Sequence, residues 1–155
     1  MALVHEKLYR SGNLSRIDFA EYLRSLSVAL FHSCRAGADR VRLVFEASDV
    51  SLDVNTAIPC GLIANELILN ALKHGFPSER SGSLRVGLQV LGDGRYRMVV
   101  ADDGVGFPEN LDFRMTETLG LQLVTLLVGQ LEGKIELDRT EGAAFTVTFR
   151  EQKPA

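Results

Sequence analysis

VVADDGVGFP, residues 99–108, places two carboxylates and two glycines where an apolar strand pattern ends. The preceding residues RYRMVVAD (95–102) alternate as in a strand with one buried face. Because successive side chains of a strand point to opposite faces, Asp102 falls on the apolar face and Asp103 on the other. Burying a carboxylate without a donor is costly, so Asp102 needs backbone N–H partners or a ligand that brings a donor.

Gly104 and Gly106 remove two side chains just beyond Asp102, which lets a flat ligand approach the backbone. Two interpretations stay open from this stretch alone. It is an Asp-Gly turn made of ordinary turn residues, or it is the floor of a pocket in which a carboxylate meets a ligand.

Hydrophobic periodicity over the rest of the chain predicts single helices alternating with paired strands. Helices are expected over 1–10, 15–35, 56–74 and 119–132, the second and third of them capped by Ser15 and Asn55. Hairpins are expected to join 41–47 to 50–54, 83–91 to 95–102, and 134–139 to 143–151. This order predicts an α/β (α+β) fold, a two-layer sandwich with helices on one face of a mixed, mostly antiparallel sheet.

Composition narrows the function classes. A chain of 155 residues is the size of one domain, and a net charge of −3 gives no electrostatic reason to expect nucleic-acid binding. The most apolar long segment, 58–72, is interrupted by polar residues, so no membrane contact is expected. Cys34 and Cys60 have no metal-binding spacing and are expected to be reduced structural thiols. We therefore expect a soluble, cytoplasmic protein.

A polar stripe crosses the otherwise apolar helix 56–74. Glu66, Asn70 and Lys73 fall within a stripe about 60° wide, with His74 at its edge. An Asn amide oxygen is a suitable ligand for Mg²⁺, and Glu66, one turn earlier, is placed to order a water or accept a proton. The alternative is a narrow solvent-facing stripe on a surface helix.

A third piece, TLGLQLV (118–124), begins where a loop turns into a helix. At Gly120, free backbone N–H groups and the positive helix end converge, which makes a seat for phosphate. The alternative is that the glycine serves only the turn.

Taken together, the three pieces resemble the ATP-binding catalytic domain of sensor histidine kinases, in the superfamily that includes gyrase, Hsp90 and MutL. NELILNALKH (65–74) resembles the N box of this family, DDGVG (102–106) its adenine box, and TLGLQLV its second glycine box. The resemblance covers about 41–150. It implies the Bergerat ATP-binding fold, with ATP between the helices and the sheet under a mobile lid.

The resemblance also implies roles for individual residues. Asp102 would accept the adenine amino group, Asn70 would hold Mg²⁺, and Glu66 would be polar support or a base. Lys73 and His74 would attend the phosphates. The implied nucleotide-binding set is Asn70, Lys73, His74, Asp102, Gly104, Gly106, Thr118, Leu119 and Gly120. Thr118 departs from the family, since many relatives have the first glycine of a G-x-G pair there, and the expected loop 107–118 lacks an evident F box.

The N-terminal segment is similar to the one that enters this domain in kinases with a HisKA_2-type dimerisation region. We therefore expect 1–14 to be a remnant of the dimerisation and phosphoacceptor hairpin or a linker, and 15–155 to be the ATP-binding domain. Because His5, His32 and His74 lack the context of a phosphoacceptor, the chain is expected to be a fragment whose acceptor histidine lies elsewhere.

The partners implied by this resemblance are the dimerisation helices of the parent kinase and, through the full-length protein, a response regulator. Two alternatives stay open. One is a serine kinase of the anti-sigma type, which shares the fold, and the other is a non-catalytic nucleotide-sensing module.

Overall fold

Five strands form one mixed sheet in the computed structural model, which describes residues 16–34, 41–74, 81–104 and 119–151. The strands are β2 (Val41–Ala47), β4 (Gly82–Gly92), β5 (Arg95–Asp102), β6 (Lys134–Asp138) and β7 (Ala143–Arg150). Their spatial order is β2-β4-β5-β7-β6, in which β2 and β4 run parallel and the other three neighbouring pairs are antiparallel. The expected mixed, mostly antiparallel sheet is confirmed.

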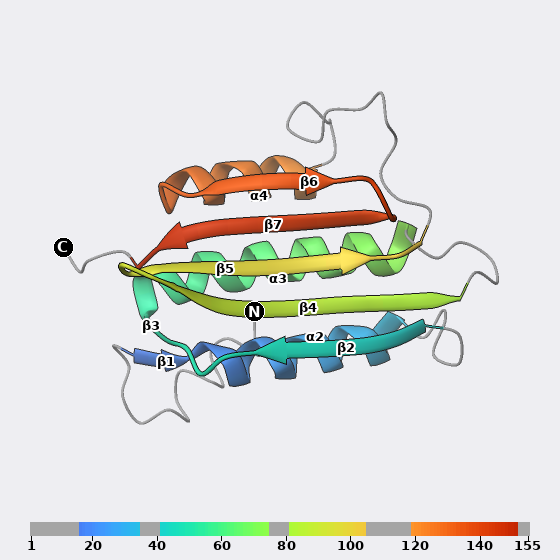
Figure 1. Cartoon of the computed structure of the whole chain (residues 1–155), viewed down its shortest axis with the longest axis horizontal. Helices are drawn as coiled ribbons and strands as arrows, with labels where there is room; N and C mark the ends of the chain where they lie inside the picture. The colour runs from blue at the N-terminus through green and yellow to red at the C-terminus, as the bar shows by residue number, and fades with distance from the viewer. Residues whose placement is uncertain (1–15, 35–40, 75–80, 105–118, 152–155) are drawn as a thin grey trace.

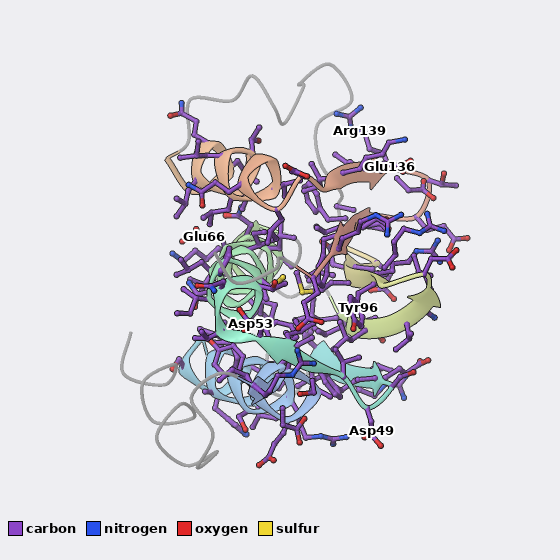
Figure 2. All side chains as sticks on the ribbon, turned by 90° about the vertical axis from the view of Figure 1, so that its left-hand side faces the viewer. Asp49, Asp53, Glu66, Tyr96, Glu136 and Arg139 are labelled. Carbon is purple, nitrogen blue, oxygen red and sulfur yellow. The ribbon has the colours of Figure 1, made fainter. Side chains whose placement is uncertain are left out.

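Three helices cover one face of this sheet (Figure 1). They are α2 (Phe19–Cys34), α3 (Val54–His74) and α4 (Leu119–Gln130), and α3 packs between the other two. Figure 2 shows the resulting two layers, with the helices on one side and the strands on the other. The core between the layers is apolar, and its largest fully buried side chains include Phe19, Leu23, Ile63, Leu67, Leu84, Leu88, Met98 and Phe149. The two-layer sandwich is therefore confirmed.

The expected hairpin of 41–47 with 50–54 is wrong. Strand β2 pairs with β4 instead, and the ladder continues one residue further, because the Ser48 N–H donates to the Leu88 carbonyl at 3.0 Å. Strand β3 (Ser51–Asp53) pairs antiparallel with β1 (Arg16–Asp18) in a separate two-stranded sheet. Alternation of apolar and polar residues identifies a strand with one buried face, but it does not identify the partner of that strand.

Both expected helix caps are also wrong, and for one shared reason. Helix α2 begins at Phe19, where the Glu21 N–H donates to Asp18 Oδ1 at 3.2 Å. Helix α3 begins at Val54, where the Asn55 N–H donates to Asp53 Oδ2 at 2.9 Å. The caps are therefore Asp18 and Asp53 rather than Ser15 and Asn55, because the two-stranded sheet of β1 and β3 ends at these two carboxylates.

The two remaining hairpins are confirmed, and helix α4 ends at Gln130, two residues before the expected end. Just beyond this end Glu132 has a φ of 53°, and the Gly133 N–H donates to the Val128 carbonyl at 3.0 Å. A β-carbon on Gly133 would lie 2.6 Å from the Thr148 carbonyl oxygen, so the glycine lets the chain pass against β7. The expected helix over 1–10 and the expected loop over 107–118 lie outside the described residues.

The expectations for the cysteines and for membrane-spanning segments can be compared with the described part of the chain. Cys60 is fully buried and unpaired, and burial raises the pKa of its thiol, as expected of a structural cysteine. The side chain of Cys34 is outside the described set. Among the helices that the structure describes, none has the length and apolar character needed to cross a membrane.

Candidate nucleotide site

The described parts of the three sequence motifs lie near one end of the sandwich, where β5 and α3 end and α4 begins (Figure 1). Strand β5 ends at Asp102, with Asp103 as the next residue, and α3 carries the polar stripe in its second half. Helix α3 contacts both β5 and α4. Residues far apart in the sequence are therefore brought to a common edge of the helix and sheet layers.

Asp102 is buried, with 6% of its surface exposed, as its place on the apolar face of the strand predicts. It pairs with Leu84 of β4 on one side and with Ala143 of β7 on the other. Its Oδ1 accepts a hydrogen bond from the Gly104 N–H at 3.0 Å. A backbone donor thus compensates part of the cost of burying this carboxylate, and the carboxylate remains fixed at the helix side of the sheet.

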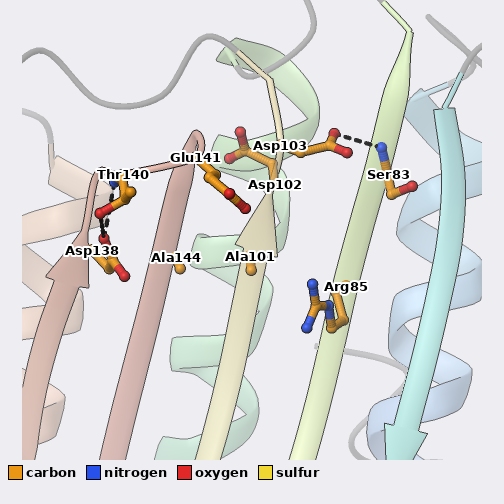
Figure 3. A pocket seen from close by; sticks show the side chains of 9 residues that line it. All are labelled: Ser83, Arg85, Ala101, Asp102, Asp103, Asp138, Thr140, Glu141 and Ala144. Carbon is orange, nitrogen blue, oxygen red and sulfur yellow. Dashed lines mark hydrogen bonds between the residues drawn. The ribbon is translucent and has the colours of Figure 1, made fainter.

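Asp103 has a different environment (Figure 3). It is exposed, its Oδ1 accepts from the Ser83 N–H at 2.7 Å, and its own N–H donates to the Ser83 carbonyl at 3.3 Å. These reciprocal bonds tie the end of β5 to the start of β4. The two neighbouring carboxylates therefore differ as predicted, one buried on the helix side and one exposed.

Gly142 is a residue of this region that the sequence analysis placed only in a hairpin turn. Its φ is +106°, and a β-carbon on it would lie 2.1 Å from the Asp102 carbonyl oxygen. The turn between β6 and β7 therefore packs against the backbone that carries Asp102. The pairing of β5 with β7 would have revealed this contact, but the chain offers no local signal for that pairing.

The polar stripe of α3 is partly buried at Glu66 and Asn70 and exposed at Lys73. A β-carbon on Gly120 would lie 2.4 Å from Glu66 Oε2, so the first turn of α4 passes directly against this carboxylate. Glu66 therefore faces α4 rather than open solvent alone, which argues against a purely solvent-facing stripe. Asn70, one turn further along α3, carries an amide oxygen of the kind that suits Mg²⁺.

The structure leaves some of the expected site residues undescribed. His74 and Leu119 lie at helix ends, but their side chains are outside the described set. Gly106 and Thr118 lie outside the described residues altogether. Within the described ranges, no group of three His, Cys, Asp or Glu side chains is arranged to hold a metal ion, so a bound Mg²⁺ would need oxygens from the nucleotide or water.

A depression of about 260 Å³ borders this region on the other face of the sheet (Figure 3). Its lining combines one cation with several oxygens and small side chains, namely Ser83, Arg85, Ala101, Asp102, Asp103, Asp138, Thr140, Glu141 and Ala144. Hydrogen bonds from the Thr140 hydroxyl and N–H lower the pKa of Asp138. Because the Asp102 carboxylate is buried on the helix side, this depression is not the expected adenine pocket.

Comparisons with known proteins agree with these motifs. A family model described as "Histidine kinase-, DNA gyrase B-, and HSP90-like ATPase" matches residues 55–153, and one described as "Histidine kinase" matches residues 1–34. The chain is 34% identical over 131 residues to blue-light-activated histidine kinase 2 of Erythrobacter litoralis, covering 84% of this chain and 37% of that protein. It is 32% identical over 139 residues to the sensor histidine kinase PdtaS of Mycobacterium tuberculosis, covering 87% of this chain and 27% of that protein.

Solved histidine kinase structures share the fold of this chain. The histidine kinase domain of the Erythrobacter litoralis EL346 blue-light activated histidine kinase superposes with a TM-score of 0.88 at 27% identity, covering 96% of this chain and 70% of that one. The catalytic domain of the histidine kinase ThkA, at 19% identity and a TM-score of 0.73, shares the fold. The chain thus spans well under half the length of the two curated relatives named above.

Proposed function

This chain belongs to the family of histidine kinase-, DNA gyrase B- and HSP90-like ATPases, and on that premise we propose that it binds Mg²⁺-ATP and transfers the γ-phosphate to a histidine of a sensor histidine kinase. The observation that carries the proposal is a buried carboxylate, Asp102, at the end of β5, together with the polar stripe of Glu66 and Asn70 on α3, the helix that contacts both β5 and α4. An apolar core alone does not require these polar groups.

Each end of the nucleotide has a partner in this proposal. The Asp102 carboxylate, held by the Gly104 N–H, accepts a hydrogen bond from the adenine amino group. Gly104 and Gly106 leave room for the ring, as the sequence pattern predicts. Leu119 and Gly120, in the first turn of α4, and Thr118, the residue before them in the sequence, offer backbone N–H groups to the phosphates.

The polar residues of α3 serve the phosphate end. Asn70 supplies an oxygen ligand to Mg²⁺. Lys73 and His74, the last two residues of α3, attend the phosphates. A bound Mg²⁺ would neutralise phosphate charge and favour phosphoryl transfer. Glu66 orders the attacking group or accepts its proton, which requires this carboxylate to be fixed in position.

Membership of this family also suggests the domain boundaries of the chain, its acceptor and its compartment. We assign residues 15–155 to the ATP-binding domain and 1–14 to a remnant of the dimerisation and phosphoacceptor hairpin or a linker. The family match at 1–34 supports a dimerisation segment at the start of the chain, but it extends past residue 14. The acceptor histidine lies on dimerisation helices supplied by the parent kinase, and a response regulator receives the phosphoryl group. The unit works in the cytoplasm, the compartment that supplies ATP.

Two experiments test the proposal, one of nucleotide binding and one of phosphoryl transfer. Calorimetry with a non-hydrolysable ATP analogue, with and without Mg²⁺, should show metal-dependent binding. The chain is then incubated with radiolabelled ATP and a separate dimerisation hairpin that carries its histidine, next to a serine-bearing acceptor of the anti-sigma type. Acid-labile label on the histidine hairpin supports the proposal. Acid-stable label on the serine acceptor alone, or no nucleotide binding, would overturn it.

A further inference from the structure

Gly120 lies against the carboxylate of Glu66 although its own backbone does not require a glycine. It belongs to the first turn of α4 and is not among the described glycines with positive φ. A β-carbon there would lie 2.4 Å from Glu66 Oε2 and 3.4 Å from Glu66 Cδ. Real β-carbons do not approach an oxygen so closely, so the missing side chain of Gly120 makes room for the carboxylate.

The other glycine of α4 makes no such close approach. Gly129 lies in the same helix, and a β-carbon on it would meet nothing within 4 Å. The contact at Gly120 is therefore not a general consequence of how α4 packs. It places one negative side chain of α3 at the end of α4 where backbone N–H groups lack partners within the helix and the helix dipole is positive.

Phosphate oxygens would bring the same sign of charge to the same turn. From this geometry we propose that Glu66 competes with the phosphates of a metal-free nucleotide, so that the site selects nucleotides whose phosphates carry a divalent cation. This inference rests on the proposed function, which puts the phosphates at the first turn of α4. Asn70 follows Glu66 by one turn on the same side of α3, so a cation held there lies beside the carboxylate and cancels the repulsion.

Calorimetry on the whole chain tests this selectivity with three probes: adenosine, ADP in the presence of a chelator, and ADP with Mg²⁺. The wild-type chain should bind ADP with Mg²⁺ at least about tenfold more tightly than metal-free ADP. Glu66→Gln keeps the size of the side chain and removes its charge. It should raise the affinity for metal-free ADP about five- to tenfold and leave the affinity for adenosine unchanged.

Glu132→Gln is the matched control. It removes one exposed carboxylate just beyond the other end of α4, so it alters the net charge equally without touching the first turn. It should leave all three affinities unchanged. Glu66→Ala, which also removes the charge, should act in the same direction as Glu66→Gln.

The possible results separate this inference from the function on which it rests. If Glu66→Gln and Glu66→Ala leave the affinity for metal-free ADP unchanged or weaken it, while adenosine still binds, the competition is refuted and the nucleotide site stands. If Glu132→Gln raises that affinity as much as Glu66→Gln, the effect is general electrostatics and the competition is again refuted. If the wild-type chain binds neither adenosine nor ADP, the proposed function fails and the inference fails with it.

Discussion

Gly142 packs directly against the backbone of Asp102: a β-carbon on Gly142 would lie 2.1 Å from the Asp102 carbonyl oxygen and 2.9 Å from the Asp103 Cα. The glycine also has a φ of +106°, a conformation that residues with a side chain rarely adopt. The turn between β6 and β7 therefore supports the end of β5 from the side. The position of the Asp102 carboxylate depends on a residue that is distant in sequence and carries no chemistry of its own.

Gly142→Ala should lower the free energy of unfolding by about 3 kcal/mol, since strained φ and overpacking act together. Gly94→Ala is its control, because Gly94 also has a positive φ, 73°, but a β-carbon there meets nothing within 4 Å. Gly94→Ala should cost only about 1 kcal/mol. Urea unfolding measures both variants, and equal losses would show that the contact with Asp102 does not matter.

Asp102→Asn should lower the affinity for ADP by roughly 10- to 100-fold, the effect of losing a charge-assisted hydrogen bond of about 1.5–3 kcal/mol. Asp103→Asn is the matched control. Its side chain keeps an oxygen that can accept from the Ser83 N–H, so it should change ADP binding little. Calorimetry compares the two, and similar losses in both variants would contradict the assignment of adenine binding to the buried carboxylate.

Local patterns predicted the elements of this fold better than their partners. The hairpins around Gly94 and Gly142 follow from turn residues between alternating strands, and both are present. The pairing of β2 with β4 could not be predicted this way, because a parallel partner lies beyond an intervening helix. The capping by Asp18 and Asp53 depends on the pairing of β1 with β3, which is likewise non-local.

The same limit applies to the site. The burial of Asp102 could be predicted from strand alternation, and the partly buried stripe of Glu66 and Asn70 from helical spacing. The contacts of Gly142 with Asp102 and of Gly120 with Glu66 join distant segments through absent side chains. A glycine in a sequence shows that a side chain is missing, but it does not show which neighbour occupies the space.

Asn70→Ala should separate recognition of the metal and phosphates from recognition of adenine. If Asn70 supplies an oxygen to Mg²⁺, the variant should bind Mg²⁺-ATP about tenfold more weakly and bind adenosine almost as well as the wild type. Competition binding with ATP, ADP and adenosine measures this difference. A uniform loss for all three ligands would instead indicate that α3 has been disrupted.

Tyr22→Phe should stabilise the protein. Tyr22 is 3% exposed, and its ring centroid lies 5.7 Å from that of Phe19. Its hydroxyl has no hydrogen-bond partner among the described residues. A buried hydroxyl without a partner is unfavourable, so its removal should raise the free energy of unfolding by about 1 kcal/mol near neutral pH. Tyr96→Phe is the control, because Tyr96 is only partly buried and the change there should be smaller.

The free energies of unfolding of Tyr22→Phe and the wild type should diverge at alkaline pH. Burial raises the pKa of Tyr22 from 10.0 to about 12 in the folded protein. Because the folded pKa lies above the unfolded one, the unfolded chain ionises first as the pH rises. The free energy of unfolding of the wild type is therefore unaffected by this group below pH 10.0 and falls between 10.0 and about 12. Urea unfolding from about pH 9 to about pH 11 should therefore show the advantage of Tyr22→Phe over wild type growing with pH. A constant difference across this range would show that the phenol ionises as easily in the folded chain as in the unfolded one.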